Sequence, residues 1–401
     1  MKSLLKSFKK RDFIAVVANR QKKFAAADDS VPSGTDAARE LARVLHPKKQ
    51  CLKVAEVIDR APDVKSFVLT PDPARGTETL AYFGAGKYLT VFVTINGMPV
   101  TRAYSISSAP KATLEGKYEL TIKLVDGGLV SRYILDNWTV GTEVTVSAPE
   151  GNFEYQPLRD AKTVVGLAGG SGITPFLSMA QAIRDGDEDF DLILLYGSRN
   201  KDNILFYDEL AALEKECPRF KAVHVLSDAD AEAGEGFEKG FITADLIQKY
   251  APQGEPYSVF LCGPQQMYAF VDKELEKLGL ERKYIRHEMF GEFHDPSTQP
   301  DYPAGVPDTV KITVTQAGET KTVEGSSNDS VLQILEKNGI SAPARCRSGE
   351  CGWCQSLLVE GQIYCPPQLE YRRLADYKFG FIHPCCSFPL TDLVIDVPEA
   401  E

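Results

Sequence analysis

The chain has 401 residues, 43% of them hydrophobic, and a formal net charge of −11 at pH 7. This length is too great for one ordinary core and favours about three domains. The acidic balance disfavours nucleic acid as a partner. No apolar run is long enough to span a membrane and no signal peptide is recognisable, so we expect a soluble, cytoplasmic protein.

Residues 1–46 are expected to form a basic helical leader and a linker. Residues 1–23 hold eight Lys or Arg side chains and one acid, Asp12. The apolar side chains that would form one stripe of this helix are Leu4, Leu5, Phe8, Ile14 and Val17. The helix either docks on a membrane surface or partner, or is solvated and packs on the next domain. We favour the second interpretation.

Residues 47–156 are expected to fold as an antiparallel β-barrel. Short alternating strands, separated by Pro, Gly and Asp turns, occur at residues 54–58, 66–69, 88–93 and 118–123. Several short strands at this spacing are typical of a barrel.

Two motifs within this barrel fit a nucleotide. Arg102, Ala103, Tyr104 and Ser105 follow one another, and strand alternation places Arg102 and Tyr104 on one face. An arginine can grip a phosphate, an aromatic ring can stack on a flat ring, and a hydroxyl can reach a ring nitrogen. Further along the chain, the turn that leads into a helical segment at 132–137 contains Gly127, Gly128 and Ser131. A glycine turn at a helix N-terminus suits a second phosphate.

Residues 157–292 alternate between strand, loop and helix, which predicts an α/β domain with a parallel sheet. A buried strand at 163–167 precedes a loop and a helix at 176–183. The loop residues that we expect to cradle a phosphate are Gly169, Gly170, Gly172 and Thr174. Pro175 stands where an ordinary dinucleotide fingerprint has its third glycine, which argues against an ordinary Rossmann dehydrogenase.

Two further segments of this domain are candidates for nucleotide contact. Ser198, with Arg199 or Lys201, follows the strand at 192–196 and is suited to a 2′-phosphate. No acidic residue that would indicate NADH stands there, so NADPH is slightly preferred and NADH stays open. Other strands are expected at 222–226 and 259–261, and the second of these is followed by Cys262, Gly263 and Pro264. Cys262 is either part of the site or a small buried residue.

Residues 293–306 are rich in Pro, Asp and Gly and read as a flexible linker. Beyond it, residues 307–401 carry Cys346, Cys351 and Cys354, and then Cys385 and Cys386. C-x₄-C-x₂-C with a distant fourth cysteine is the plant-type [2Fe–2S] spacing. Zinc and buried thiols are the alternatives, and the three-plus-one arrangement favours the iron–sulfur cluster.

Taken together, these motifs resemble those of ferredoxin–NAD(P)⁺ reductase flavoproteins with a fused C-terminal plant-type ferredoxin domain, such as oxygenase reductases and hybrid-cluster-protein reductases. The resemblance implies a multidomain protein: an antiparallel β-barrel FAD domain, an α/β parallel-sheet NAD(P) domain and an α+β β-grasp ferredoxin domain. It implies FAD rather than FMN, because the second phosphate-binding turn is present.

The same resemblance assigns roles to the candidate residues. Arg102 pairs with phosphate, Tyr104 stacks on the flavin and Ser105 contacts its ring, while the turn from Gly128 to Ser131 holds the pyrophosphate. Ser105, Cys262 and Phe290 are the residues expected at the hydride-transfer position, where Phe290 covers the flavin face. We consider Glu288 as a carboxylate that transfers protons, but we do not favour this role. Cys385, which precedes Pro389 by four residues, is the expected fourth cluster ligand, with Cys386 as its alternative.

The expected function is that NAD(P)H gives a hydride to FAD, which passes single electrons through the cluster to an acceptor protein. That acceptor is an oxygenase, a hybrid-cluster protein or a corrinoid-type enzyme. A stand-alone reductase of flavins, quinones or oxygen and a non-enzymatic scaffold are the alternatives. Residues 307–401 hold 13 acids and 8 bases, which suggests either an acidic steering surface or simply an acidic domain.

Overall fold

The structure is a computed structural model that describes residues 10–26, 36–228, 236–289 and 291–399. It divides into two units, Met1–Arg43 and Val44–Glu401. Helix α1 (Lys10–Ala25) belongs to the first unit, and α2 (Ala37–Leu45) spans the boundary. The side chains of residues 15–26 are exposed, and most of the predicted apolar stripe lies outside the described side chains. No helix in the described part of the chain is long and apolar enough to cross a membrane.

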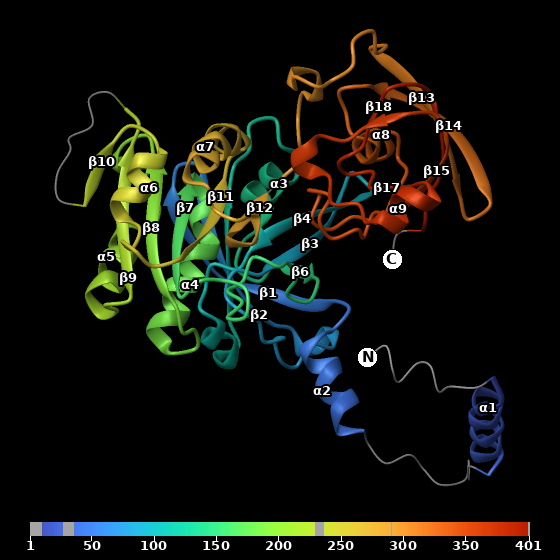
Figure 1. Ribbon diagram of the computed structural model, residues 1–401, viewed down its shortest axis with the longest axis horizontal. Helices are drawn as coiled ribbons and strands as arrows, with labels where there is room; N and C mark the ends of the chain where they lie inside the picture. Colours follow the sequence, from blue (N-terminus) through green and yellow to red (C-terminus); the bar gives the residue numbers. More distant parts are fainter. Residues whose placement is uncertain (1–9, 27–35, 229–235, 290, 400–401) are drawn as a thin grey trace. The chain divides into compact units, whose positions relative to one another are not determined.

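The first sheet of the second unit is antiparallel and has six strands in the order β4-β3-β6-β1-β2-β5 (Figure 1). Its strands are β1 (Gln50–Ala61), β2 (Val64–Pro71), β3 (Tyr88–Ile95), β4 (Met98–Ser105), β5 (Tyr118–Lys123) and β6 (Glu143–Val146). A bridge between Ile106 and Leu120 joins the two ends of the sheet and closes the barrel. The expected barrel is thereby confirmed, and its inward side chains, such as Leu52, Val54 and Phe67, form the core.

Two details of this barrel differ from the expectation. Strand β6 was not expected, because four residues with two apolar positions carry almost no periodic signal. Helix α3 (Leu129–Asn137) begins three residues earlier than predicted, so Ser131 lies inside its first turn. The short helices of this region are η1 (Pro73–Arg75) and η2 (Pro110–Glu115).

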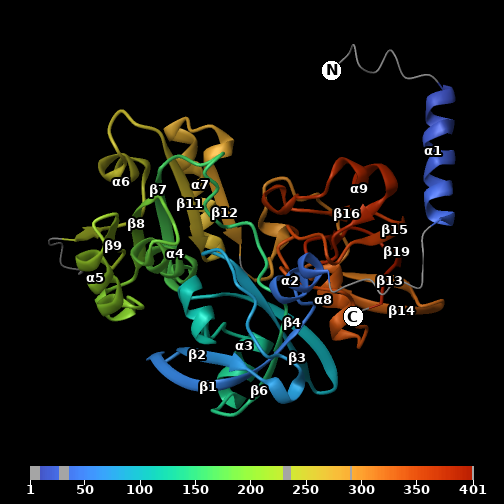
Figure 2. The same cartoon turned by 90° about the horizontal axis from the view of Figure 1, so that it is seen from below.

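The second sheet is parallel throughout, in the order β10-β9-β8-β7-β11-β12. Its strands are β7 (Thr163–Gly169), β8 (Asp191–Ser198), β9 (Phe220–Leu226), β10 (Phe237–Lys239), β11 (Tyr257–Gly263) and β12 (Ile285–Met289). Figure 2 shows the sheet between two layers of helices: α4 (Thr174–Asp185) and α5 (Tyr207–Glu216) on one face, and α6 (Ala244–Tyr250) and α7 (Gln265–Leu278) on the other. The strand order reverses between β7 and β11, and ligands of open α/β sheets bind at such a reversal.

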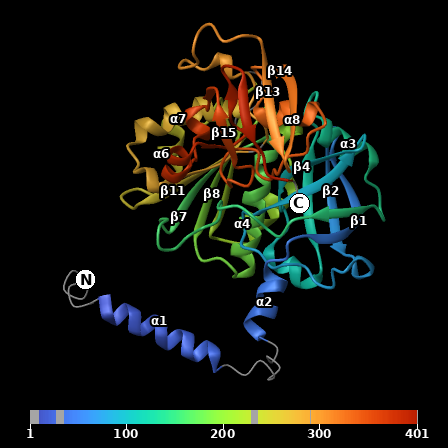
Figure 3. The same cartoon turned by 90° about the vertical axis from the view of Figure 1, so that its right-hand side faces the viewer.

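The third sheet forms the C-terminal domain and runs β14-β13-β19-β15-β17, beside a small β16-β18 pair. Its elements are β13 (Thr309–Gln316), β14 (Glu319–Ser326), α8 (Val331–Lys337), β15 (Ser356–Glu360), β16 (Ile363–Tyr364), α9 (Leu374–Phe379), β17 (Phe381–Ile382), β18 (Phe388–Pro389) and β19 (Leu393–Asp396). Helix α8 packs beside the β13–β14 hairpin (Figure 3). The long loop between α8 and β15 carries the first three cysteines of the motif.

Residues 293–306, which precede this domain, pack against it. Phe293 is buried with its ring 6.0 Å from that of Phe388, and the rings of Tyr302 and Tyr364 lie 5.1 Å apart. Tyr364 also donates a hydrogen bond of 2.7 Å to Asp301. The flexible connection suggested by the Pro- and Gly-rich composition is therefore not what the structure shows, because aromatic contacts hold the segment against the domain.

Candidate functional site

The glycine loop at the end of β7 lies against the end of β11. A Cβ on Gly172 would stand 2.2 Å from the carbonyl oxygen of Cys262, and one on Gly169 would stand 2.5 Å from the sulfur of Met267. Only glycine permits this approach. Gly170, with φ of 52°, faces open space, and Thr174 donates from Oγ1 to the carbonyl of Ser171 at 3.1 Å. The loop therefore leaves room for an anion at the N-terminus of α4.

The end of β8 adds a polar group beside this loop. Ser198 has a buried hydroxyl with no hydrogen-bond partner among the described residues, and the following Arg199 is exposed. The hydroxyl of Tyr196 donates to the carbonyl of Gly170 at 2.9 Å, which ties β8 to the glycine loop. Lys201 lies over the ring of Phe237 at 4.8 Å. A buried hydroxyl without a partner is a candidate ligand contact, because leaving it unpaired is costly.

The barrel strand β4 carries the second group of candidates. The Arg102 guanidinium lies 3.1 Å from Glu292 Oε1 and donates to the carbonyl of Thr101 at 2.8 Å. Burial and the nearby Arg347 lower the pKa of Arg102. Burial raises the pKa of Tyr104, and the hydroxyl of Ser105 is buried without a hydrogen-bond partner in the described chain.

The turn before α3 is also a close-packed one. A Cβ on Gly128 would lie 2.8 Å from Val125 Cβ and 2.9 Å from Ser131 Oγ, and Gly127 has φ of 67°. Ser131 Oγ accepts a hydrogen bond from the Val125 backbone N–H at 3.1 Å. The turn is thus preformed at the N-terminus of α3, as a phosphate site requires.

Strand pairing brings Cys262 opposite Glu288, which sequence analysis considered as a proton-handling carboxylate but did not favour. Glu288 is 3% exposed, and its Oε2 has no hydrogen-bond partner among the described residues. Burial, followed by the charges of Glu350 and Cys346, raises the pKa of Glu288 well above its usual range. Burial and Glu288 likewise raise the pKa of Cys262. A buried carboxyl group with an unpartnered oxygen is a candidate site residue, and the pairing of β11 with β12 places it beside Cys262. The predicted Phe290 lies outside the described residues.

The cysteines of the loop before β15 come together with Cys385. The Cys354 and Cys385 sulfurs are 3.4 Å apart, and the thiols of Cys351 and Cys385 both hydrogen-bond to Cys346, whose pKa they lower. Backbone N–H groups of Cys351 and Trp353 point at the sulfurs of Cys346 and Cys351, at 3.4 Å each. Such N–H groups stabilise a negatively charged cluster.

The contacts of the cysteine side chains bear on the choice of cluster ligands. Cys346, Cys351, Cys354 and Cys385 form a chain of contacts, and three close cysteines with a distant fourth suit a [2Fe–2S] cluster. Cys386 instead lies 3.8 Å from Cys365, sulfur to sulfur, and a Cβ on Gly349 would stand 2.7 Å from the Cys386 sulfur. The geometry therefore favours Cys385 as the fourth ligand.

The loop between α8 and β15, which carries Cys346, Cys351 and Cys354, is called the cluster loop. It faces the antiparallel barrel across a cavity of about 150 Å³. The residues that line it are Tyr88, Glu150, Gly151, Asn152, Arg345, Glu350, Cys351 and Trp353. Tyr88 pairs with Ser105 across β3 and β4, and burial together with Cys346, Cys351 and Glu288 raises its pKa. The cavity thus lies between the candidate flavin strand and the candidate cluster ligands.

Ionic and polar contacts hold the cluster loop against the barrel. Arg345 forms an ion pair with Glu150 and lies 3.5 Å from the ring centroid of Trp353, and Thr101 donates to the carbonyl of Ala344 at 2.9 Å. Arg347, in a left-handed conformation with φ of 61°, is 1% exposed.

The buried Arg347 joins three parts of the chain. It binds Glu292 Oε1 at 2.5 Å and also pairs with Glu336 on α8. Glu292 therefore connects Arg347 in the cluster loop to Arg102 on β4.

Comparisons with known proteins agree with this geometry. The domain family described as "Oxidoreductase FAD-binding domain" matches residues 52–155, "Oxidoreductase NAD-binding domain" matches 167–273, and "2Fe-2S iron-sulfur cluster binding domain" matches 314–390. The fold and the site together define a flavoprotein oxidoreductase with an attached iron–sulfur domain.

Relatives align with this chain over nearly their whole length. The glycine betaine monooxygenase reductase subunit of Pseudomonas aeruginosa is 28% identical, over 87% of this chain and 95% of that protein. The ferredoxin reductase component of 3-ketosteroid-9-alpha-monooxygenase from Rhodococcus rhodochrous is also 28% identical, over 85% and 94%. The structure of phthalate dioxygenase reductase aligns with a TM-score of 0.62 and 27% identity, over 87% of this chain and 98% of that one.

The chain thus carries a FAD-binding, an NAD-binding and a C-terminal 2Fe-2S domain in that order, and it is similar to ferredoxin reductase components of oxygenases. It is an NAD(P)H-dependent FAD/[2Fe–2S] oxidoreductase that delivers electrons to a partner protein.

Proposed function

We propose that this protein is the reductase component of an oxygenase system and that it delivers single electrons to the oxygenase component. When bound, FAD accepts a hydride from NAD(P)H and the [2Fe–2S] cluster carries one electron at a time. The observation that carries the proposal is the cavity shared by Tyr88 and Cys351, because it joins the flavin strand to the cluster loop. The relatives named as reductase components of monooxygenases support an oxygenase as the acceptor.

The barrel residues bind and orient the flavin in this proposal. Arg102, with Gly127, Gly128 and Ser131, holds phosphate, while Ala103 and Tyr104 support the ring. Ser105 offers its unpartnered hydroxyl to the ring. Burial raises the pKa of Glu288, which favours its neutral form near the position where a hydride arrives.

The α/β domain positions the nicotinamide nucleotide. Its glycine loop, with Gly169, Gly170, Gly172 and Thr174, cradles the phosphates at the N-terminus of α4. Cys262, Gly263 and Pro264 hold the nicotinamide end beside the flavin. Ser198 and Arg199 bind a 2′-phosphate, so we propose NADPH as the preferred donor; the buried, unpartnered hydroxyl of Ser198 supports this. Phe290 is proposed to cover the flavin face.

The four cluster ligands are proposed to be Cys346, Cys351, Cys354 and Cys385, and the close approach of Cys354 and Cys385 supports this set. The proposed domain boundaries are a leader and linker at 1–46, the FAD domain at 47–156, the NAD(P) domain at 157–292, a connection at 293–306 and the ferredoxin domain at 307–401. We also propose a reducing, cytoplasmic site of action, which the nine free cysteines of the chain support.

Replacement of one ligand tests the electron route. Cys351→Ser should abolish NAD(P)H-driven reduction of cytochrome c, a one-electron acceptor, and spare reduction of ferricyanide by the flavin. Cys217→Ser, at a buried cysteine of the NAD(P) domain, is the matched control and should retain both activities. Equal loss of both activities in Cys351→Ser with flavin still bound would contradict the proposed order. Unchanged cytochrome c reduction would instead indicate a stand-alone reductase that does not need the cluster.

A further inference from the structure

Helix α9 has the reverse of the amphipathic pattern that surface helices normally have. Its acid, Asp376, is buried, whereas Leu374 is 89% exposed, Phe379 is 62% exposed and Tyr377 is 51% exposed. A surface helix normally turns its apolar side chains to the core. An exposed apolar group of this kind is typical of a binding surface.

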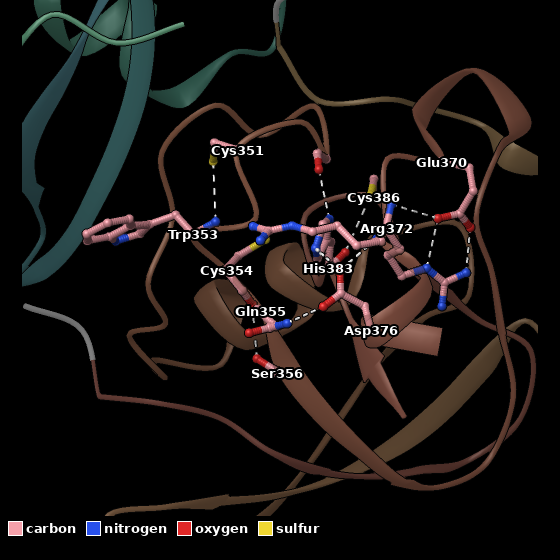
Figure 4. Close-up of polar contacts among 12 residues, drawn as sticks. Cys351, Trp353, Cys354, Gln355, Ser356, Glu370, Arg372, Asp376, His383 and Cys386 are labelled. Carbon is pink, nitrogen blue, oxygen red and sulfur yellow. Dashed lines mark hydrogen bonds and ion pairs between the residues drawn. The ribbon is translucent and has the colours of Figure 1, made fainter. Parts of the chain in front are cut away.

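The inward face of α9 is fixed to the cluster-binding segments. Asp376 accepts a hydrogen bond from the side chain of Gln355, the residue after Cys354, and its Oδ2 lies 3.9 Å from His383 Nε2. His383 in turn binds the carbonyl oxygen of Gly349 in the cluster loop through Nδ1 at 2.7 Å. These contacts tie α9 to the segments that carry the cysteines, and Figure 4 shows Asp376 beside Gln355 and His383.

The other side of that loop faces the barrel, although Cys351 and Trp353 there remain exposed. Cys351 and Trp353 line the cavity shared with Tyr88 and Glu150 of the barrel. Figure 4 shows Trp353 on the opposite side of the loop from Glu370 and Arg372, which flank the start of α9. An acceptor that binds on the α9 side therefore does not compete with the barrel for the loop.

The charges around α9 differ in sign from those of its domain. Residues 307–401 carry 13 acids and 8 bases, yet Arg373 and Lys378 are exposed beside the apolar side chains of α9. Neither Glu370 nor Asp376 presents a free negative charge at this surface. Glu370 pairs with Arg372 at 2.5 Å, and Asp376 is buried. The acidic steering surface considered from composition is thus not present at this position.

We propose that the α9 face, formed by Leu374, Tyr377 and Phe379 with Arg373 and Lys378, is the docking surface for the electron acceptor. The acceptor that fits has an apolar contact region surrounded by acidic side chains, because basic rim charges attract an acidic partner. This inference rests on the proposed function and adds the place and charge of the partner contact.

The test uses two protein acceptors of opposite charge with the full-length holoprotein. The acidic soluble haem domain of cytochrome b5 and the basic cytochrome c each accept one electron. Lys378→Glu should lower kcat/KM for the acidic acceptor by about tenfold at low salt and should not lower it for cytochrome c. The matched control is Lys321→Glu on β14, an exposed lysine of the same domain that changes net charge equally; it should change either rate by less than about twofold.

The apolar part of the surface is tested separately. The double variant Leu374→Ser/Phe379→Ser should lower kcat/KM for the acidic acceptor, whereas Leu114→Ser, at an exposed leucine of the barrel domain, should not. Equal effects of the two lysine variants, or no effect of the double variant, would overturn the proposal. Loss of self-association in sedimentation without a change in acceptor reduction would also overturn it, because α9 would then bind a second copy.

The design separates this inference from the proposed function. Failure of NAD(P)H to reduce the cluster in the unmodified protein would refute the proposed electron route. The cluster can still be reduced with dithionite, freed of excess reductant and mixed with the cytochrome b5 domain. Slower cluster oxidation in Lys378→Glu than in Lys321→Glu would support the docking surface, and equal rates would reject it.

Discussion

The two sides of the cluster loop are built in opposite ways. The side that faces the flavin domain is held by ion pairs and hydrogen bonds of Arg345, Arg347 and Thr101, of which Arg347 is buried and the other two are partly buried. The outer side carries α9, whose apolar side chains are exposed. A fixed contact on the inner side sets the distance for electron transfer from the flavin to the cluster. An exposed outer face suits a partner protein that binds and dissociates.

The largest expected effect lies on the inner side, at Arg347. Arg347→Ala would leave the partly buried Glu292 and Glu336 without their common partner, which costs about 3–5 kcal/mol of unfolding free energy. Chemical denaturation of the holoprotein measures this loss. Arg75→Ala, at a half-exposed arginine paired with Glu143, is the control and should cost about 0–1 kcal/mol. Equal, small losses of unfolding free energy in both variants would show that the ion pairs of Arg347 do not fix the cluster loop.

A smaller effect is expected at Arg345. Arg345→Ala removes the pairing with Glu150 and the contact with Trp353, for a loss of about 1–3 kcal/mol. Because both partners line the cavity between flavin strand and cluster, cluster reduction should slow while flavin reduction by NAD(P)H stays the same. Rapid-mixing absorbance at flavin and cluster wavelengths separates the two rates. Equal slowing of both rates would argue that Arg345 acts on the nucleotide site.

Thr101→Val tests a single hydrogen bond on the inner side. The loss of the 2.9 Å contact with the carbonyl of Ala344 should cost about 1 kcal/mol. Denaturation curves read by tryptophan fluorescence provide the measurement. Thr94→Val, at an exposed threonine of the same strand pair, is the control and should leave stability unchanged.

The smallest effect on stability is expected on the outer side. Leu374→Ser should change the unfolding free energy by less than about 0.5 kcal/mol, because the side chain is 89% exposed. Thermal unfolding detects any larger change. A loss comparable to that of Arg347→Ala would remove the contrast between the two sides.

Local motifs explain why much of the molecule could be predicted from sequence. The three closely spaced cysteines and the glycine loop of residues 169–172 act through contacts within a few residues, so their spacing carries the information. The three-domain order followed from the same motifs. The roles of individual site residues remain predictions.

The features that sequence analysis missed depend on contacts between distant segments. Glu292 bridges Arg102 and Arg347, which are 245 residues apart in the chain, and no periodicity records such a bridge. Glu288 was considered from the sequence, but only strand pairing places it opposite Cys262. Residues 293–306 were predicted to be a flexible linker because they are rich in Pro, Asp and Gly. The structure instead shows that Phe293 and Tyr302 pack the segment against the C-terminal domain.

The most direct test of the central claim is the order of reduction within one turnover. The oxidised holoprotein is mixed with NADPH, flavin absorbance is followed by stopped flow, and the reduced cluster is followed by freeze-quench electron paramagnetic resonance. The account predicts that the flavin is reduced first and that the cluster signal then rises, with no cluster signal in protein stripped of flavin. A cluster signal that precedes flavin reduction, or that appears without flavin, would contradict it.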